Sequence, residues 1–276
     1  MVIKEAIEFG REKLKESLYT DPIKESRFIL SFLLNKDLSF ILINPDYKLE
    51  DKIAKDFTNI VLQRQAGQPL AYLLKSANFY GRDFYVDSRS LIPRWDTENL
   101  VEQVIDLAKN IDKPKILEIG AGSGAISITM GLEIPEARVS GVDISLATLE
   151  VCNINLERYK EAKVEFFKSN LYENISGQYD IIVSNPPYIK RADLEGLQTE
   201  VKKEPLNALD GGEDGLDFYR QIIKSAKKYL KDSGYLVFEL GAGQYQDVKK
   251  ILLANNFTNI GYKKDLQGII RVIWAS

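Results

Sequence analysis

Four consecutive residues beyond the middle of the chain could hold a planar nitrogen group for reaction. Asn185, Pro186, Pro187 and Tyr188 come just after an apolar stretch that predicts a strand at residues 179–183. Prolines fix their own φ angles and restrict the residue before each, so the Asn185 side-chain oxygen and the Pro186 carbonyl keep a rigid relation. Each oxygen can accept a hydrogen bond from one N–H group of an amide or aromatic amine, and Tyr188 can stack on the planar group.

Such a pair of acceptors suits the activation of a nitrogen whose lone pair is delocalised. With both N–H bonds held, the lone pair can develop toward an electrophile, and catalysis consists of positioning and stabilisation of growing positive charge. The proton can leave after the new bond has formed, so no general base is required beforehand. A plainer interpretation is a proline turn that ends a strand, with Tyr188 as a core or surface aromatic.

The composition excludes several other kinds of catalysis. The chain has 276 residues and no histidine, which removes a histidine base, a Ser-His or Cys-His nucleophile pair and a histidine metal ligand. A single cysteine, Cys152, rules out an internal disulfide and a multi-cysteine metal site. We therefore expect no metal, and a reaction that depends on carboxylates, amides, backbone or a borrowed cofactor.

A glycine-rich loop predicts a place where a ligand touches bare backbone. Gly120, Ala121, Gly122, Ser123 and Gly124 follow an apolar strand end and precede a helix predicted from about residue 125. Glycine is needed where a strand turns sharply and a ligand must approach the main chain.

An acidic residue ends the next predicted strand. Asp143 follows the glycine loop by about 20 residues, a distance that suits a carboxylate bound to the two hydroxyls of a ribose. A nucleoside-containing ligand is the interpretation that explains both features. Gly120, Gly122 and Ala125 also match G-x-G-x-x-A, so NAD binding stays open, as do a ligand-free turn and an N-cap role for Asp143 before Ser145.

These residues must be positioned by a sheet domain. From residue 99 onward, predicted strands and helices alternate, which indicates an α/β fold with a doubly wound, mostly parallel, seven-stranded sheet. The last two strands have no helix between them and should form an antiparallel hairpin at the edge. We expect strands at residues 115–118, 138–142, 164–167, 179–183, 235–239, 258–262 and 269–274, and helices at 99–110, from 125, from 146, and at 218–231 and 245–254.

The residues before the sheet predict two further parts. Residues 1–75 read as a small helical-bundle domain, with Asp21 and Pro22 opening its second helix and a third helix at residues 49–66. On the first helix, apolar residues share one face: Ile3, Ile7, Leu14 and Leu18. Residues 76–98 contain two β-like runs around a turn and are interpreted as a β-hairpin linker to a domain at 99–276.

Charge and hydropathy set the expected surroundings. Lys and Arg number 37 against 40 Asp and Glu, a net charge of −3 that does not favour wholesale binding to a phosphate backbone. No apolar stretch approaches the about 20 residues that span a bilayer, and the first residues lack the apolar core of a signal peptide. We expect a cytoplasmic protein.

The glycine loop, Asp143 and Asn-Pro-Pro-Tyr together resemble the class I S-adenosylmethionine-dependent methyltransferases, which have a Rossmann-like fold. Further stretches narrow the resemblance to the release factor glutamine methyltransferase family, the protein-(glutamine-N5) methyltransferases. These stretches are 91–94 with 97–98, 204–205 with 208–209, 211–216 with 219–220, and 239–241 with Gln244.

This resemblance implies an activity and a partner. The family transfers a methyl group from S-adenosylmethionine, leaving S-adenosylhomocysteine, to the side-chain amide of the glutamine in the Gly-Gly-Gln motif of class I peptide chain release factors. The helical domain would help to dock the release factor, and neither direct nucleic-acid binding nor a membrane is expected.

The same resemblance implies roles for individual residues. Gly120 to Gly124 would line the cofactor loop, Asp143 would hold the ribose, and Asn170 and Leu171 would flank the adenine. Asn185 would lie between cofactor and substrate, and the glutamine amide would be held by Asn185, Pro186, Pro187 and Tyr188. Of these, Asn185, Pro186 and Tyr188 would be the catalytic set.

The chain departs from the family pattern in two places. Arg94, Trp95, Asp96, Thr97 and Glu98 stand where Arg-Pro-Glu-Thr-Glu is usual, and Asn170 stands where aspartate is common. The first departure leaves open what Trp95 and Asp96 do, and Arg94 and Glu98 could serve either a substrate lip or a linker salt bridge.

Two other enzyme classes remain as alternatives. An N6-adenine or other nucleic-acid amino-methyltransferase would act on a similar planar amine, although the acidic balance weighs against it. An NAD-dependent oxidoreductase would explain the glycine loop but not Asn-Pro-Pro-Tyr.

Overall fold

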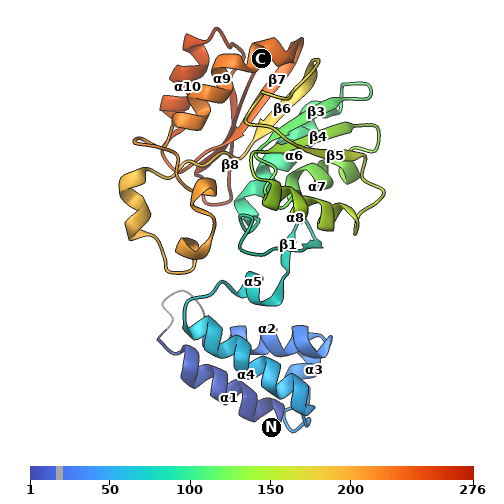
Figure 1. Ribbon diagram of the computed structural model, residues 1–276, viewed down its shortest axis with the longest axis vertical. Coiled ribbons are helices and arrows are strands. Elements are labelled where there is room, and N and C mark those ends of the chain that lie inside the picture. The colour runs from blue at the N-terminus through green and yellow to red at the C-terminus, as the bar shows by residue number, and fades with distance from the viewer. Residues whose placement is uncertain (17–20) are drawn as a thin grey trace. The chain divides into compact units, whose positions relative to one another are not determined.

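The computed structural model describes residues 1–16 and 21–276, and its elements are labelled in Figure 1. Leu18, which the sequence places on the apolar face of the first helix, lies outside the described residues. Contacts divide the chain into a helical unit and a sheet unit. The helical unit consists of Met1–Ser76 and Gln198–Lys203, and the sheet unit consists of Ala77–Leu197 and Glu204–Ser276.

The helical unit is a bundle whose second helix begins as the sequence predicts. The Asp21 carboxylate accepts hydrogen bonds from the Ile23 and Lys24 amides at 3.0 and 3.1 Å, and Pro22 occupies the first helical position. Buried side chains from different helices, Ile3, Ile29 and Phe57 among them, form its core. The helices are α1 (Ile3–Leu14), α2 (Pro22–Leu34), α3 (Leu38–Ile43), α4 (Asp51–Gln65) and α5 (Leu70–Leu74).

One buried arginine holds a distant segment within this unit. Arg64 of α4 is 6% exposed, forms an ion pair with Glu25 of α2, and lies 2.5 Å from the carboxylate of Glu200. It also donates to the Gln68 carbonyl at 3.1 Å. Because a buried cation needs partners, these carboxylates explain why residues 198–203 belong with the helices rather than with the sheet.

The sheet unit confirms the predicted seven-stranded, mostly parallel architecture. Its strands follow the order β5-β4-β3-β6-β7-β9-β8, parallel from β5 to β7, with β9 antiparallel to both of its neighbours. The strands are β3 (Lys115–Ile119), β4 (Arg138–Asp143), β5 (Val164–Lys168), β6 (Tyr179–Ser184), β7 (Leu230–Glu239), β8 (Gly261–Lys264) and β9 (Ile270–Ala275).

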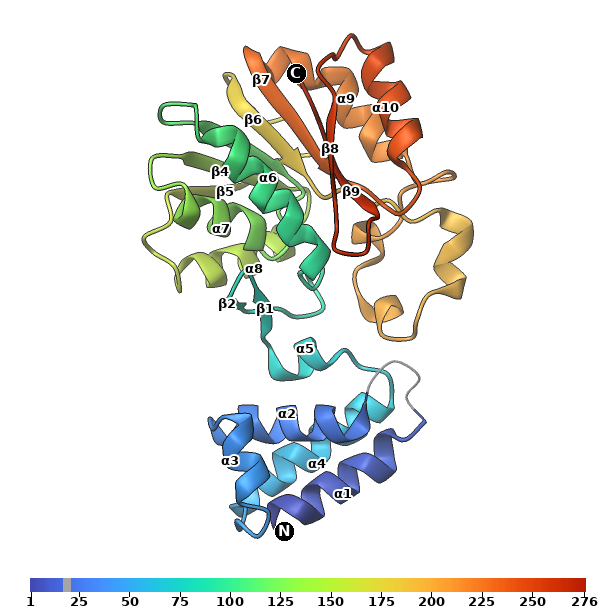
Figure 2. The same ribbon diagram turned by 180° about the vertical axis from the view of Figure 1, so that it is seen from behind.

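Helices cover both faces of the sheet because side chains alternate along each buried strand. Leu117, Ile182 and Leu236 face one core, whereas Ile116, Ile181 and Val237 face another. Figure 2 shows α6 lying along one face. The helices of this unit are α6 (Glu98–Ala108), α7 (Ala125–Glu133), α8 (Leu146–Leu156), α9 (Asp217–Tyr229) and α10 (Tyr245–Ala254).

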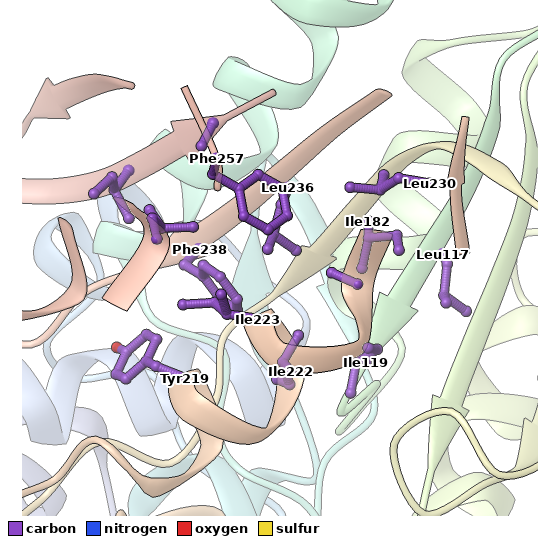
Figure 3. Close-up of a cluster of buried hydrophobic side chains, with 14 of the residues drawn as sticks. Leu117, Ile119, Ile182, Tyr219, Ile222, Ile223, Leu230, Leu236, Phe238 and Phe257 are labelled. Carbon is purple, nitrogen blue, oxygen red and sulfur yellow. The ribbon is translucent and has the colours of Figure 1, made fainter. Parts of the chain in front are cut away.

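The core beneath α9 supports the strand ends that matter for the site. Figure 3 shows Phe238 of β7 close to Tyr219 and Ile223 of α9, and the Tyr219 and Phe238 rings meet edge to face with centroids 5.3 Å apart. The Tyr219 hydroxyl donates to the main-chain carbonyl of Glu239 at 2.8 Å. The last residues of β7 are therefore tied to the helix that covers them.

The predicted hairpin exists, and it packs on the sheet unit. Strands β1 (Ala77–Phe79) and β2 (Arg82–Phe84) pair antiparallel around Tyr80 and Gly81, whose φ angles of 53° and 71° suit a two-residue hairpin turn. Phe79 and Phe84 are 1% and 0% exposed in the same core as α6.

Several predicted boundaries are wrong, and two of them matter most. The helix predicted at residues 218–231 ends at Tyr229, because Leu230 already pairs with Tyr179 and starts β7 before a register irregularity. The strand predicted at 258–262 lies at Gly261–Lys264, where it pairs with β9. The polar residues and glycine at 231–234 are typical of a loop, so the sequence pattern does not predict that β7 starts at Leu230.

Between β6 and α9 the chain forms short 3₁₀ helices: η2 (Arg191–Gly196), η3 (Val201–Lys203) and η4 (Leu206–Ala208). A further one, η1 (Trp95–Thr97), precedes α6. Across residues 1–16 and 21–276, none of the helices combines the length and apolarity needed to cross a membrane.

Replacing Gly10 by alanine should destabilise the helical unit. Glycine to alanine in an exposed helix normally stabilises by about 1 kcal/mol, but a Cβ at Gly10 would lie 2.0 Å from the Ser26 hydroxyl oxygen of α2. Since α1 and α2 must then separate, we expect Gly10→Ala to lower the free energy of unfolding by about 1–3 kcal/mol in urea titrations. Gly196→Ala is the control, because no heavy atom lies within 4 Å of its Cβ position. A Gly10→Ala protein as stable as wild type would contradict this packing.

Candidate active site

A cavity of about 260 Å³ opens in the sheet unit where three parallel strands end. Ile119, Asp143 and Ser184, the last residues of β3, β4 and β6, all line it. Ligands of doubly wound α/β folds bind beyond the carboxyl ends of the strands, so the location is the one expected for a cofactor or substrate. Most of the residues that the sequence singles out line this cavity: Gly120, Ala121, Gly122, Ser123, Asp143, Asn170, Leu171, Asn185, Pro186 and Pro187.

The glycine loop presents bare backbone to the cavity. Gly120 and Gly122 have φ angles of 83° and 56°, and at each of them nothing lies within 4 Å of the position that a Cβ would take. The Gly120 and Ala121 amides both donate to the Val142 carbonyl, at 2.8 and 2.9 Å, which ties the loop to β4. A side chain at Gly120 or Gly122 would occupy space that a ligand could use.

Asp143 stands at the wall of the cavity with its carboxylate oriented by two main-chain amides. Its oxygens accept from Ser145 and Gly122 at 3.0 and 3.2 Å. The N-cap of α8 is Ser145, whose hydroxyl oxygen accepts from the Thr148 amide, so Asp143 is not the helix cap. Burial raises the pKa of Asp143, and its remaining lone pairs can accept hydroxyl groups from a ligand.

Asn185 is the first residue after β6, and its amide is held at one end. The side-chain nitrogen donates to the Thr97 hydroxyl at 3.2 Å, which leaves the Asn185 oxygen for the cavity that this residue lines. Pro186 and Pro187 line the cavity beside it. The structure therefore brings the predicted acceptor residues together with the glycine loop and Asp143.

Two predicted site residues do not line the cavity. Gly124 faces inward, where a Cβ would lie 3.0 Å from the Phe166 ring and 3.3 Å from the Cys152 backbone. Tyr188 packs against the core of the sheet unit, and burial raises the pKa of its hydroxyl to about 12. Its carbonyl accepts from the Gln244 side chain at 3.0 Å.

A buried carboxylate that the sequence patterns do not single out also lines the cavity. Glu118 is 0% exposed, and one of its oxygens accepts from both the amide and the hydroxyl of Ser127. Its other oxygen, Oε1, has no hydrogen-bond partner within the described part of the chain. An acidic residue inside the apolar strand before the glycine loop was the available signal, since an unpaired buried carboxylate is costly without a function.

Residues 94–98, which depart from the family pattern, make different contacts from one residue to the next. Arg94 lines the cavity and forms an ion pair with Glu204, whose side chain is 2% exposed and also accepts from the Ile92 amide. Glu98 accepts from the Tyr80 amide at 2.7 Å and so supports the hairpin. Trp95 is 80% exposed, and Asp96 pairs with Arg271 at 2.9 Å.

The residues present fit a nucleoside cofactor with a positively charged centre. Open backbone at Gly120 and Gly122 admits a flat, close ligand, and the Asp143 carboxylate can bind paired hydroxyls. Glu118, with one oxygen unpartnered among the described residues, lines the same cavity, and a cation bound there would favour the ionised form of this carboxyl, whose pKa burial raises to about 8.

Known proteins show what this chain is similar to. Residues 97–204 match a family model described as methyltransferase small domain, and residues 5–74 match one described as PrmC N-terminal domain. A release factor glutamine methyltransferase of Fusobacterium nucleatum is 43% identical over 269 residues, which cover 96% of this chain and 76% of that protein. The release factor glutamine methyltransferase of Geobacter sulfurreducens is 38% identical over 273 residues, or 98% and 95% of the two chains.

The fold also has counterparts among solved structures. The crystal structure of a methyltransferase from Pyrococcus furiosus superimposes with a TM-score of 0.52 at 18% identity, covering 79% of this chain and 95% of that one. At this identity the match concerns the fold alone, and it agrees with the predicted class I methyltransferase architecture.

Replacing Glu118 by glutamine should change how stability depends on pH. Burial raises the pKa of Glu118 from 4.5 to about 8, so between these values the folded protein keeps a proton that the unfolded chain releases. Folding stability is therefore lost as pH rises through this interval, and Glu118→Gln, which cannot ionise, should lose less. In thermal unfolding between pH 5 and 9, we expect the Tm of the variant minus the Tm of wild type to increase as pH rises. The exposed Glu161→Gln is the control, and parallel pH curves for Glu118→Gln and wild type would contradict the burial of this charge.

Proposed function

Because the chain belongs to the family of release factor glutamine methyltransferases, we propose that it methylates a glutamine of a class I peptide chain release factor, using S-adenosylmethionine. The glutamine is the one in the Gly-Gly-Gln motif, and the methyl group goes to its side-chain amide nitrogen. The observation that carries the proposal is the Asn185 amide, held by Thr97 so that its oxygen is left for the cavity beside the glycine loop.

The cofactor site follows from the residues that line one part of the cavity. The loop residues from Gly120 to Ser123 would hold the cofactor against their backbone, and the Asp143 carboxylate would accept hydrogen bonds from the ribose hydroxyls. Asn170 and Leu171 would flank the adenine, and Glu118 would face the positive charge. S-adenosylmethionine supplies an electrophilic methyl group on a sulfonium, which accounts for a methyl transfer without histidine or metal.

The substrate amide is prepared by two acceptors. The Asn185 side-chain oxygen and the Pro186 carbonyl each accept a hydrogen bond from one N–H group of the glutamine amide. These two bonds fix the plane of the amide relative to the methyl group. Near-attack positioning of this kind is the larger part of catalysis for a weak nucleophile. As the nitrogen–carbon bond forms and the carbon–sulfur bond of the donor breaks, the nitrogen would gain positive charge, which the same two oxygens would stabilise until the proton passes to water.

Pro187 and Tyr188 complete the substrate residues in this proposal. Pro187 restricts the backbone of Pro186, so the Pro186 carbonyl keeps its direction. Tyr188 is packed against the core and anchored through its carbonyl to Gln244, which gives the segment a fixed end. Because Tyr188 does not line the cavity, we propose that it supports the acceptor residues from the core side, and its raised pKa keeps the hydroxyl neutral.

The helical unit is proposed to help bind the release factor. It has its own core, and several large apolar side chains of its helices are exposed, including Phe28, Leu42 and Ile43. Residues 5–74, which match the PrmC N-terminal model, form most of this unit. Since the substrate is a translation factor, the reaction belongs in the cytoplasm.

Methyl transfer from labelled S-adenosylmethionine tests the function directly. Purified protein should label a class I release factor at one glutamine, and mass spectrometry should locate the added methyl on its side-chain amide. The same release factor with that glutamine replaced by alanine is the control and should take no label. Label in DNA or RNA, with none in the release factor, would favour the nucleic-acid methyltransferase instead.

Replacing Asn185 by alanine should separate the chemical step from cofactor binding. Loss of one of the two acceptors should lower kcat by about 10²- to 10³-fold, as removal of one stabilising hydrogen bond does in other active sites. Calorimetry should show S-adenosylmethionine binding close to that of wild type. Asp143→Ala should give the opposite pattern, with cofactor binding weakened first. An Asn185→Ala enzyme with nearly normal turnover would refute the acceptor mechanism.

A further inference from the structure

Glu239 is a buried carboxylate that the proposed mechanism does not use. It is the last residue of β7, is 2% exposed, and does not line the cavity. Its Oε2 atom has no hydrogen-bond partner in residues 1–16 and 21–276. A buried carboxylate with one unpaired oxygen lowers stability, so a functional role would explain why Glu239 is placed here.

The sheet places Glu239 beside the acceptor amide. Ser184 of β6 is paired in register with Phe238 of β7, so the next residues, Asn185 and Glu239, follow side by side at the carboxyl ends of their strands. Thr97, at the start of α6, reaches the same point, because its hydroxyl accepts from the Asn185 nitrogen at 3.2 Å. Thr97 is 3% and Glu239 is 2% exposed, whereas Asn185 is partly exposed where it lines the cavity.

The carboxylate decides which end of the Asn185 amide faces the cavity. A threonine hydroxyl can donate or accept, so Thr97 alone would tolerate either end of the amide. The Thr97 and Asn185 side chains both act as donors to the Glu239 carboxyl. When Glu239 is ionised it can only accept, so the Thr97 proton points to Glu239 and the Thr97 lone pair points to the Asn185 nitrogen.

We propose that Glu239, acting partly through Thr97, is a positioning residue that keeps the Asn185 oxygen toward the cavity and makes that oxygen more negative. This inference rests on the proposed function, in which the Asn185 oxygen accepts an N–H bond from the substrate glutamine. With the amide reversed, its NH₂ would face the NH₂ of the substrate, and neither group could accept. A negative charge behind the amide also strengthens the oxygen as an acceptor for a nitrogen that becomes positive.

Several charged and titratable groups surround Glu239 and set its ionisation. Asp96 raises its pKa, and Arg271 of β9 lowers it, while Arg271 is also paired with Asp96. Tyr188 and Tyr219 also interact electrostatically with Glu239, and burial, together with this carboxyl, raises the pKa of both hydroxyls. Burial is the largest effect, and with the others it raises the pKa of Glu239 to about 7.

Ionisation of Glu239 should therefore appear in the pH dependence of the chemical step. Because the ionised form is the active one, kcat should rise with pH through about 7 in the wild-type enzyme. Glu118 also has a raised pKa, but it is present in both proteins when wild type is compared with Glu239→Gln. The difference between the two profiles then reports Glu239 alone.

Glu239→Gln is the first test, because the side chain keeps its shape and loses its charge. We expect kcat to fall by about 10- to 100-fold, the effect of losing a partner that orients a functional group at other polar sites. The KM for S-adenosylmethionine should stay close to wild type, and the rise of kcat near pH 7 should disappear. Asp180→Asn, a buried carboxylate at the opposite end of β6, is the control and should keep that rise.

The orientation of the amide can also be followed without turnover. In ¹⁵N NMR of the wild-type protein, the Asn185 side-chain NH₂ signal should shift with a midpoint at about pH 7. The Glu239→Gln protein should show no such transition. Assignment is made by the loss of the signal in Asn185→Ala.

Thr97→Val and Thr97→Ser test the relay. Valine removes the hydroxyl and should lower kcat as Glu239→Gln does, whereas serine keeps the hydroxyl and should restore most of the rate. Thr129→Val is the matched control, because the Thr129 hydroxyl is also buried but has no hydrogen-bond partner within the described residues. Its activity should equal that of wild type.

The outcomes separate this inference from the function on which it rests. If wild type methylates the release factor, Asn185→Ala is inactive, and Glu239→Gln keeps the wild-type rate and pH profile, the positioning role is wrong and the function stands. An Asn185 NH₂ signal that does not respond to pH in wild type would also overturn it. Absence of methyl transfer by wild type would instead overturn the proposed function.

Discussion

The parallel register of β6 with β3 on one side and β7 on the other is the constraint on which the candidate site depends. Ile119 pairs with Ser184, and Ser184 pairs with Phe238, so three strands end level with one another. The Ser184 hydroxyl donates to the Ile119 carbonyl at 2.7 Å and secures this alignment. A slip of one residue would turn the side chain of Asn185 to the opposite face, away from the glycine loop.

The architecture and most of the cavity could be predicted because they follow from local patterns. Strand periodicity, the glycines and the proline pair each act within a few residues, and they correctly predict a seven-stranded sheet and bring Asn185 to the same edge as Asp143. Glu118, Thr97 and Glu239 could not be assigned in this way, because their significance comes from burial and from partners distant along the chain, such as Asn185, which is 88 residues from Thr97. Such partners are visible only once the chain has folded.

The absence of histidine from the chain has a structural counterpart in its buried carboxyls. Glu118 and Glu239 have pKa values raised to about 8 and about 7, and Asp143 is raised in the same direction. Two carboxyls whose charge changes near neutral pH, Glu118 and Glu239, are therefore available toward the ends of β3 and β7. Glu118 and Asp143 line the cavity proposed to hold a sulfonium, and a cation bound there would favour the ionised form of both carboxyls.

The ion pairs of Arg64 have a consequence for the order in which the protein can be completed. A ribosome synthesises α4 long before it reaches Glu200, so the nascent helical bundle first contains Arg64 with Glu25 but without its second carboxylate. The N-terminal unit therefore lacks the ion pair between Arg64 and Glu200 when its own 76 residues have emerged. This ion pair can form only after the strands through β6 have been translated. Because synthesis runs from the N-terminus, the helical bundle gains its second ion pair only after the segment that carries Asn185 has been made.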